Sequence, residues 1–274
     1  RKIMVSTDGR VEGKIAIVTG GAMGMGNGVA RVLARNGAKV HIMDRSDTVE
    51  AAAQKLRDEG LDVTAFQVDI TDKAKLTAIY DEIGKKNGTI DILVNVAGIG
   101  DQKYFVNVED DYLDKVFSVN FRGTWNSCKA AVPYMIKNKY GKIVNFSSVT
   151  GVMVVDPGMT VYGATKGAIM AFTKALASEM ASSNITVNAI LPGVIDTPMM
   201  DATCIDSNPD DPESVKEGIA STVPMGRLGT IEEAGKVALF LSSDLSSYVT
   251  GLGVVFDGGS TLPESAGSGW EPAE

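Results

Sequence analysis

Short apolar runs alternate with longer helical patterns along most of the chain, and this alternation limits the possible folds more than any other feature. Strands that are separated by helices require crossover connections, and right-handed crossovers produce a parallel sheet with helices on both faces. The sequence therefore predicts a doubly wound α/β fold. The predicted strands are residues 14–19, 38–44, 62–69, 90–97, 141–148, 185–192 and 252–257, and the predicted helices are residues 25–37, 50–60, 72–87, 109–138, 158–183 and 231–242.

The chain is long enough for one large core, because 44% of its 274 residues are hydrophobic. No internal repeat and no linker rich in Pro or Gly divides it. We therefore expect one domain over residues 1–260, followed by a loop-like tail over residues 261–274 that contains Trp270. The irregular segment 196–225 carries the acidic turn SNPDDPES between short helices.

The acidic charge narrows the range of partners. The formal net charge is -8 and the sequence pI is about 4.8. An acidic surface repels phosphate backbones and anionic lipids, so neither nucleic acid nor a membrane is an expected partner. No apolar stretch approaches the roughly 18–20 residues of a membrane span, and the first residues lack the apolar core of a signal peptide. We expect a cytoplasmic protein in which Cys128 and Cys204, far apart in the sequence, are reduced thiols.

The single histidine, His41, excludes several kinds of catalytic site. A Ser-His-Asp hydrolase needs a histidine beside its nucleophile, and a zinc site built from several histidines needs more than one. His41 falls in a predicted buried strand, where we expect a structural imidazole with a hydrogen-bond partner. No metal site is predicted, and an acid or base must come from Tyr, Lys, Asp, Glu or Cys.

A glycine-rich loop, VTGGAMGMGNG over residues 18–28, follows the first predicted strand and opens the first predicted helix. Glycines there allow a tight turn, and the helix start offers N–H groups to a pyrophosphate. Asp44 ends the second strand, where a carboxylate can bind ribose hydroxyls and repel a 2′-phosphate. Arg45 could hold that phosphate, but the loop 19–28 has no Lys or Arg. We therefore predict NAD(H) rather than NADP(H).

Tyr162 and Lys166 are four residues apart in a predicted helix, so they share one face. The spacing alone is weak evidence, because it arises readily by chance. A free tyrosine has a pKa near 10, too high for an efficient base at neutral pH. A close ammonium and a cationic nicotinamide would favour the phenolate and lower that pKa.

Several spaced motifs occur in one order, and together they resemble the short-chain dehydrogenase/reductase family over residues 12–260. Val96 departs from the pattern, since the family usually has a second Asn there. The resemblance implies one Rossmann-type domain with seven parallel strands, assembled as a homotetramer. The motifs are Thr19-Gly20-x3-Gly24-x-Gly26, Asp69, Asn95-Val96-Ala97-Gly98, Asn120, Ser148, Tyr162-x3-Lys166 and Pro192-Gly193.

The resemblance also implies a role for each matching residue. The glycines would face the pyrophosphate, Asp44 the ribose, Asp69 with Ile70 the adenine, and Ile195 with Thr197 the nicotinamide carboxamide. The predicted cofactor residues are Gly20, Met23, Gly24, Met25, Gly26, Asp44, Arg45, Asp69, Ile70, Asn95, Ala97, Gly98, Tyr162, Lys166, Pro192, Gly193, Ile195 and Thr197.

Four residues form the predicted catalytic set. Tyr162 would be the acid in reduction and the base in oxidation, and Lys166 would tune it and bind the nicotinamide ribose. Ser148 would hydrogen-bond the substrate oxygen. Ser148 is preferred to Ser147 because Ser148-x-x-Gly151 matches the family spacing. Asn120 would position a water between Lys166 and solvent.

The substrate is expected to be a large apolar alcohol or ketone. Methionines adapt to irregular apolar surfaces, and they occur in both segments expected to flank the substrate, the loop after Ser148 and a lid over 196–225. Ordinary core or lid packing would also explain them. These segments resemble bacterial hydroxysteroid dehydrogenases, with a 20β-hydroxysteroid as the candidate. The predicted substrate residues are Met153, Val155, Met159, Met199 and Met200.

Three other functions remain open. A 3-oxoacyl-(acyl carrier protein) reductase would require NADPH and a basic docking face, which Asp44 and the net acidity oppose. A dehydrogenase of small ketones or sugar alcohols would share the same catalytic set. A non-catalytic dinucleotide sensor would typically lack the Tyr or Lys that this chain keeps.

Overall fold

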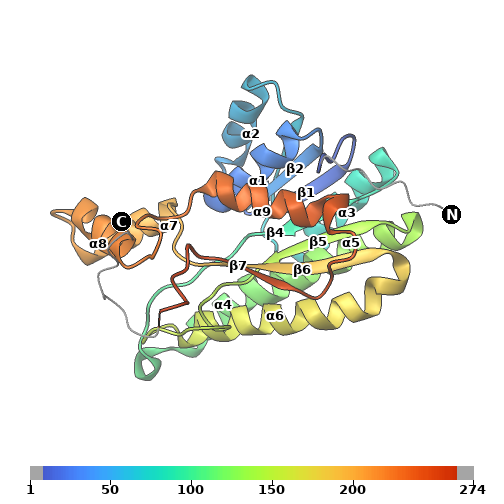
Figure 1. Ribbon diagram of the computed structural model, residues 1–274. Helices are drawn as coiled ribbons and strands as arrows, with labels where there is room; N and C mark the ends of the chain where they lie inside the picture. Colours follow the sequence, from blue (N-terminus) through green and yellow to red (C-terminus); the bar gives the residue numbers. More distant parts are fainter. Residues whose placement is uncertain (1–8, 264–274) are drawn as a thin grey trace.

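Seven parallel strands form one sheet in the order β3-β2-β1-β4-β5-β6-β7 (Figure 1). The computed structural model describes residues 9–263; residues 1–8 and 264–274, with Trp270 and most of the expected tail, lie outside the described part. The predicted α/β fold with a seven-stranded parallel sheet in one domain is confirmed. The strands are β1 (Ile15–Thr19), β2 (Lys39–Asp44), β3 (Val63–Gln67), β4 (Ile92–Asn95), β5 (Gly141–Phe146), β6 (Ile185–Pro192) and β7 (Gly253–Phe256).

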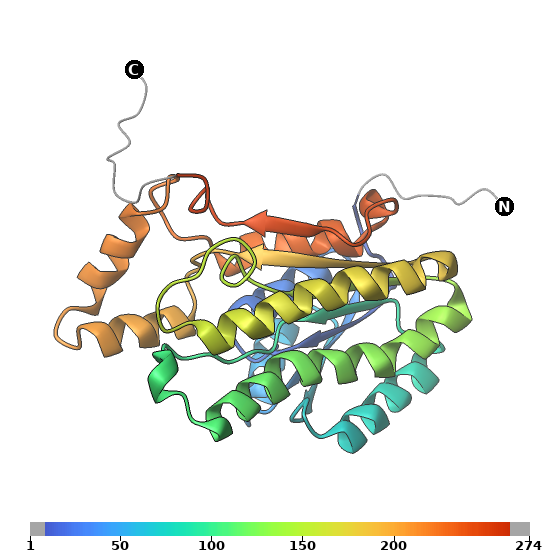
Figure 2. The same ribbon diagram turned by 90° about the horizontal axis from the view of Figure 1, so that it is seen from below.

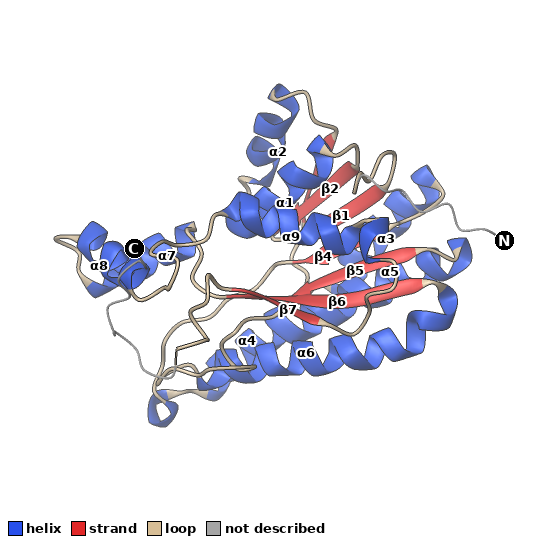
Figure 3. Ribbon diagram, in the orientation of Figure 1, coloured by secondary structure: helices blue, strands red, loops and turns tan. Residues whose placement is uncertain are grey.

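Helices cover both faces of this sheet, as Figure 3 shows in blue around the red strands. Figure 2 shows α3, α5 and α6 side by side over one face. The helices are α1 (Gly24–Arg35), α2 (Val49–Asp58), α3 (Lys73–Asn87), α4 (Asp110–Phe117), α5 (Thr124–Asn138), α6 (Thr160–Met180), α7 (Pro198–Ser207), α8 (Pro212–Ser221) and α9 (Ile231–Ser242).

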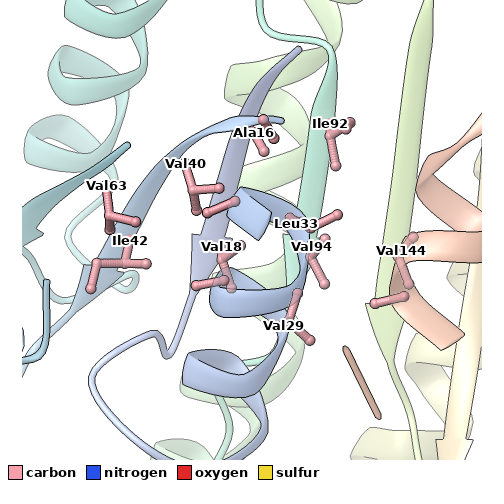
Figure 4. Packing of buried hydrophobic residues seen from close by; sticks show 14 of the residues in the cluster. Ala16, Val18, Val29, Leu33, Val40, Ile42, Val63, Ile92, Val94 and Val144 are labelled. Carbon is pink, nitrogen blue, oxygen red and sulfur yellow. The ribbon is translucent and has the colours of Figure 1, made fainter. Parts of the chain in front are cut away.

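Alternate residues of each central strand enter two different cores. In β1, Ala16 and Val18 lie with residues of α1 (Figure 4) in a core that also includes α2 and α9. Ile15 and Ile17 lie in the other core, with α3, α5 and α6. A strand buried on both faces needs apolar residues at every position, because successive side chains point to opposite sides. This explains why the strands were recognisable as continuous apolar runs.

The order of the strands creates a crevice at one edge of the sheet. The chain proceeds from β1 to β2 and β3 on one side, and then returns to place β4 on the other side of β1. Loops that leave β1 and β4 therefore diverge, and ligands of doubly wound sheets bind where this happens. In Figure 2 the arrowheads of β6 and β7 point toward α7 and α8, so these two helices lie beyond the same edge.

The expected continuous helix over 109–138 is wrong in its centre. The segment Ser118–Gly123 is π-helical and separates α4 from α5. The buried side chain of Asn120 lies in this turn and bonds both backbone groups of Ile99, each at 2.8 Å. The hydroxyl of Thr124 also donates to the carbonyl of Asn120 at 2.8 Å. A π-turn inside a helix often accompanies such a functional constraint, and the helical sequence pattern gives no sign of it.

His41 lies in β2 and is buried, as predicted, but the expected hydrogen-bond partner is missing. Within the described chain neither ring nitrogen has a partner, and the ring packs against Phe66 with centroids 6.0 Å apart. Burial lowers the pKa of His41 from 6.5 to about 4, because a charged imidazolium would be desolvated there. The imidazole is therefore neutral and acts as an apolar ring.

This shift makes stability depend on pH. Between pH 6.5 and about 4 the unfolded chain binds a proton on His41 that the folded chain does not. The stability contribution is therefore fully present above pH 6.5 and falls as the pH drops through that window, by at most about 3 kcal/mol.

The variant His41→Leu should keep more of its stability in acid. Urea unfolding at about pH 7.5 and about pH 4.5 measures the difference, and we expect the loss to be smaller in the variant by about 2 kcal/mol. Ile42→Val is the control, since it shrinks a neighbouring buried side chain and should act equally at both pH values. An equally steep acid loss in His41→Leu would contradict this assignment.

None of the described helices is long and apolar enough to cross a membrane.

Candidate active site

Two cavities of about 770 Å³ each lie along the carboxyl edge of the sheet. The first is formed by segments that follow β1, β2, β3 and β4. The second is formed by segments that follow β4, β5 and β6, together with α6 and α7. The two cavities share a wall, so a molecule bound in one lies beside a molecule bound in the other. The residues that line both are Met25, Val96, Gly98, Thr197 and Met199.

The predicted cofactor residues gather around these cavities, with Asn95 as the exception. Gly20, Met23, Gly24, Met25, Gly26, Asp44, Arg45, Asp69, Ile70, Ala97, Gly98 and Thr197 line the first cavity. Tyr162, Lys166, Pro192, Gly193 and Ile195 line the second.

The glycine-rich loop turns back on itself at the start of α1. A Cβ at Gly26 would lie 2.0 Å from the carbonyl oxygen of Gly20, so only glycine allows this approach. Gly20 has a φ of +71°, a conformation that side chains disfavour. The start of α1 has no side-chain cap and no acidic residue in its first turn. Its N–H groups therefore suit a phosphate, which is the group the sequence predicted.

Asp44 also has a structural role in the glycine-rich loop. Its carboxylate accepts hydrogen bonds from the N–H of Ala22 at 3.1 Å and from the N–H of Ser46 at 3.0 Å. Asp44 thus holds the glycine-rich loop against the end of β2 while it lines the first cavity. Asp47 and Asp69 line the same cavity, and Arg45 is the one cation among the described residues of its lining.

Asn95 lies beneath the cavities, in a buried polar network. Its amide nitrogen donates to the side-chain oxygen of Asn145 at 2.9 Å and contacts the sulfur of Cys128 at 3.4 Å. Asn145 in turn donates to Thr173 of α6 at 3.0 Å. The expectation that Asn95 lines the cofactor cleft is therefore wrong, because its side chain points into the core between β4 and β5.

Ser148, Tyr162 and Lys166 come together at the second cavity. The Lys166 Nζ donates to the carbonyl of Phe146 at 2.9 Å and lies 5.4 Å from the centre of the Tyr162 ring. Ser148 leaves the end of β5, and its hydroxyl accepts the N–H of Thr150 at 3.1 Å.

The neighbouring serine has a different task. The Ser147 hydroxyl donates to the backbone carbonyl of Lys166 at 2.8 Å and so ties α6 to the sheet. The Ser147 hydroxyl hydrogen is already bonded to the helix backbone. This supports the choice of Ser148 as the group that faces a substrate.

Burial is the main cause of the pKa shifts of Tyr162 and Lys166. It raises the pKa of Tyr162 above 10, and a hydrogen bond from Ser148 opposes this rise. Burial also lowers the pKa of Lys166 from 10.5 to about 8. Without a bound dinucleotide, desolvation of the phenolate sets the direction of the Tyr162 shift, and the lowering of its pKa by Lys166 together with a cationic nicotinamide stays a prediction.

Asn120 does not line either cavity. Besides its two bonds to Ile99, its amide donates to the hydroxyl of Thr165 at 3.0 Å, one residue before Lys166 in the chain. A Cβ at Gly98 would lie 3.4 Å from the Asn120 side-chain oxygen and 3.5 Å from the Lys166 Nζ. Asn120 therefore fixes the loop after β4 against α6, next to Lys166.

Three of the five predicted substrate residues line the second cavity, namely Met159, Met199 and Met200. Met153 and Val155 do not, and their side chains are 50% and 59% exposed. The chain turns sharply here, since Gly151 has a φ of +89° and donates to the carbonyl of Val154 at 2.8 Å. This turn directs both side chains away from the cavity.

The sequence did not identify several other polar residues of the second cavity. They lie in the loop after β4, the loop before α6, and α7, which meet only in the folded chain. An Asp or Gln in an exposed loop carries no pattern that marks it as a lining residue. They are Asp101, Gln102, Thr150, Asp156, Thr203, Asp206 and Ser207. Among residues 9–263, no group of three or more His, Cys, Asp or Glu is arranged to hold a metal ion.

Comparisons with known sequences match this chain to oxidoreductases. Residues 20–261 match a family profile described as Enoyl-(Acyl carrier protein) reductase. Oxidoreductase UcpA of Salmonella typhimurium is 47% identical over 261 residues, which cover 95% of this chain and 99% of that protein. A 3-oxoacyl-[acyl-carrier-protein] reductase FabG of Thermotoga maritima is 39% identical, covering 91% of this chain and 98% of that protein.

Solved structures are similar over nearly the whole fold. Levodione reductase superposes with a TM-score of 0.87 at 30% identity and covers 92% of this chain and 99% of its own. A gluconate 5-dehydrogenase from Burkholderia cenocepacia, in complex with NADP and tartrate, has a TM-score of 0.84 at 33% identity, covering 93% and 98%. With its glycine-rich loop and its Ser148, Tyr162 and Lys166 at one edge of the sheet, the chain belongs to the short-chain dehydrogenase/reductase family of oxidoreductases.

Proposed function

We propose that this oxidoreductase uses NAD(H) to interconvert a secondary alcohol and a ketone, with Ser148, Tyr162 and Lys166 as its catalytic residues. One observation carries the proposal. The cavity lined by these three side chains shares a wall with the cavity that contains the glycine-rich loop. A dinucleotide in one and a carbonyl compound in the other would meet beside Gly98 and Thr197.

The residues of the first cavity fit a nicotinamide dinucleotide. Gly20, Gly24 and Gly26 form a cradle that side chains would fill, and the start of α1 offers N–H groups to the phosphates. Asp69 and Ile70 would hold the adenine, and Ile195 and Thr197 the carboxamide of the nicotinamide.

The charge of the adenosine end favours NAD(H). Three carboxylates, Asp44, Asp47 and Asp69, line the first cavity with Arg45 as their one cationic neighbour there. A 2′-phosphate would bring a further negative charge next to Asp44 and would be repelled. Ribose hydroxyls, in contrast, donate hydrogen bonds that a carboxylate accepts.

Reduction adds a hydride to the carbonyl carbon and a proton to its oxygen, and oxidation removes both. The bound dinucleotide supplies the hydride or accepts it. Ser148 donates a hydrogen bond to the substrate oxygen, and Tyr162 gives up its phenolic proton to that oxygen. The raised pKa of Tyr162 keeps this proton in place at neutral pH until charge develops on the substrate.

Lys166 stabilises the phenolate that proton donation leaves behind. Its pKa of about 8 keeps the side chain mostly protonated at neutral pH. Asn120 is a positioning residue in this scheme, and it would hold a water that returns a proton to the pair.

The substrate side supports a large molecule with an apolar face. Met159, Met199 and Met200 give the second cavity an adaptable apolar surface. A steroid is the candidate class, with a 20β-hydroxysteroid as the specific suggestion, and α7 and α8 in the segment 196–225 would act as its lid. A small ketone or a sugar alcohol would fit the same catalytic set.

A second candidate is reduction of a 3-oxoacyl group on acyl carrier protein, because a 39% identical relative carries that name. That function would need NADPH and a basic face for an acidic carrier. The net charge of -8 and the carboxylate of Asp44 oppose both requirements. A non-catalytic sensor is disfavoured because Tyr162 and Lys166 are present and line the cavity.

Four copies are proposed to assemble in the cytoplasm, as the family resemblance and the acidic charge suggest. Trp125 is 47% exposed and packs against Phe121 and Phe172, with 5.0 Å between its ring centre and that of Phe172. An aromatic cluster exposed on α5 and α6 supports a subunit contact at this face.

Tyr162→Phe should abolish turnover and leave dinucleotide binding nearly unchanged, because it removes only the transferable proton. We expect a loss of at least about a hundredfold in kcat. Steady-state reduction of a ketone measures turnover, and NADH fluorescence titration measures binding. Tyr248→Phe, at a fully exposed tyrosine, is the matched control. Equal loss of turnover and binding would assign Tyr162 a structural role instead.

Asp44→Asn should weaken the preference for NADH over NADPH by about tenfold, since it removes one charge at nearly constant shape. The ratio of kcat/KM for the two cofactors measures this effect. Asp58→Asn, exposed on α2, should leave the ratio unchanged. An unchanged ratio in Asp44→Asn would contradict the electrostatic explanation. Asp44 would then serve only to hold the glycine-rich loop in place.

A further inference from the structure

We propose that the catalytic cleft selects uncharged substrates that carry hydroxyl groups away from the reacting carbon, and that Asp101, Asp156 and Asp206 reject carboxylates. The inference deepens the proposed function and rests on it. It concerns the outer part of the second cavity, the rim, defined here as Asp101, Gln102, Asp156, Thr203, Asp206 and Ser207.

One wall of the rim is built by two loops that are bonded to each other. The Gln102 amide donates to the carbonyl of Pro157 at 2.9 Å, and the N–H of Lys103 donates to the carbonyl of Gly158 at 2.9 Å. A Cβ at Gly158 would collide with Gln102, so the loops approach closely. Asp101 directly precedes Gln102 and Asp156 directly precedes Pro157, so this contact brings the two carboxylates to the same wall.

The other part of the rim comes from α7. Thr203, Asp206 and Ser207 lie on this helix within one turn of each other, and all three line the cavity. Thr197 caps the helix, since its side chain accepts the N–H of Met200 at 3.3 Å. Asp206 is therefore positioned by a helix whose first turn is capped.

The rim offers hydrogen-bond acceptors and few donors. Three of its members are carboxylates. The Thr203 hydroxyl donates to the carbonyl of Met199 at 3.0 Å, and the Ser207 hydroxyl donates to the carbonyl of Thr203 at 2.8 Å. Their hydrogens are thus engaged with the helix backbone, and each hydroxyl oxygen can still accept a hydrogen bond from a ligand. Gln102 likewise spends an amide hydrogen on Pro157. A ligand that matches this surface must donate hydrogen bonds.

Cations that might bind a carboxylate are engaged elsewhere. Lys166 is the one Lys or Arg in the described lining, and its Nζ is held by Phe146 next to Tyr162. Lys103 lies over the ring of Tyr112, 4.4 Å from its centre. Lys216 pairs with Asp196 at 2.6 Å and Asp201 at 2.9 Å. A substrate carboxylate at the rim would meet three like charges and no free Lys or Arg among the described lining residues.

These features fit an uncharged molecule with two unlike sides. Its apolar body would rest on Met159, Met199 and Met200, and its hydroxyl groups would donate to the rim. Removal of the rim charges should therefore change the selection between neutral and anionic substrates more than it changes catalysis.

The test compares ketones that differ only in one terminal group, a CH2OH in one and a carboxylate in the other. L-Sorbose with 5-keto-D-gluconate is such a pair, because the differing group lies at the far end of the molecule from the ketone carbon. The readout is the ratio of kcat/KM for the neutral and the anionic member, measured with the full chain and NADH. We expect a ratio of at least about tenfold in the parent for any pair that is turned over.

The variant Asp101→Asn/Asp156→Asn/Asp206→Asn should lower that ratio at least about threefold, and salt should lower it in the parent because screening weakens repulsion. Asp210→Asn is the matched control, since Asp210 is exposed near α7 but does not line the cavity. An unchanged ratio in the triple variant, or a parent that prefers the carboxylate, would overturn the inference. Inactivity toward every ketone would count against the proposed function itself.

Discussion

The common direction of the seven strands is the constraint on which the rest of the molecule depends. Because all strands end at the same edge, the glycine-rich loop, Asp44 and Ser148 all lie along that edge although they are far apart in the sequence. Gly26 then has to pack against the backbone of Gly20, since α1 begins directly at this edge. The cradle for a dinucleotide is thus a consequence of how the first strand connects to the first helix.

Burial is a second constraint, and it acts on the two residues that we propose to be catalytic. Tyr162 and Lys166 are both withdrawn from water, and each is pushed toward its neutral form. A protonated phenol suits donation to a carbonyl, and an ammonium with a pKa near neutrality can respond to the charge that forms. Ser147 and Asn120 contribute indirectly, because their hydrogen bonds fix α6 and the loop after β4 in place.

The sequence predicted features that depend on a local pattern of residues. It did not predict features that depend on contacts between distant segments. Apolar runs such as that of β1 predicted the sheet, and the glycine and Tyr162-Lys166 spacings indicated residues that line the two cavities. Asn95 was misplaced because its partner Asn145 lies on another strand. Met153 and Val155 were assigned to the cleft without knowledge of the turn at Gly151. The rim could not be foreseen, since it depends on loops joined through Gln102 and Pro157.

The most direct test of the account is NADH consumption by the purified full chain, with NADPH in parallel, against uncharged hydroxylated ketones such as cortisol and L-sorbose. The account predicts that at least one of these ketones is reduced, and that NADH is used in preference to NADPH. If NADH binds but no ketone causes its oxidation, the joined cavities serve binding without chemistry, and the central claim that Tyr162 delivers a proton to a substrate oxygen is contradicted.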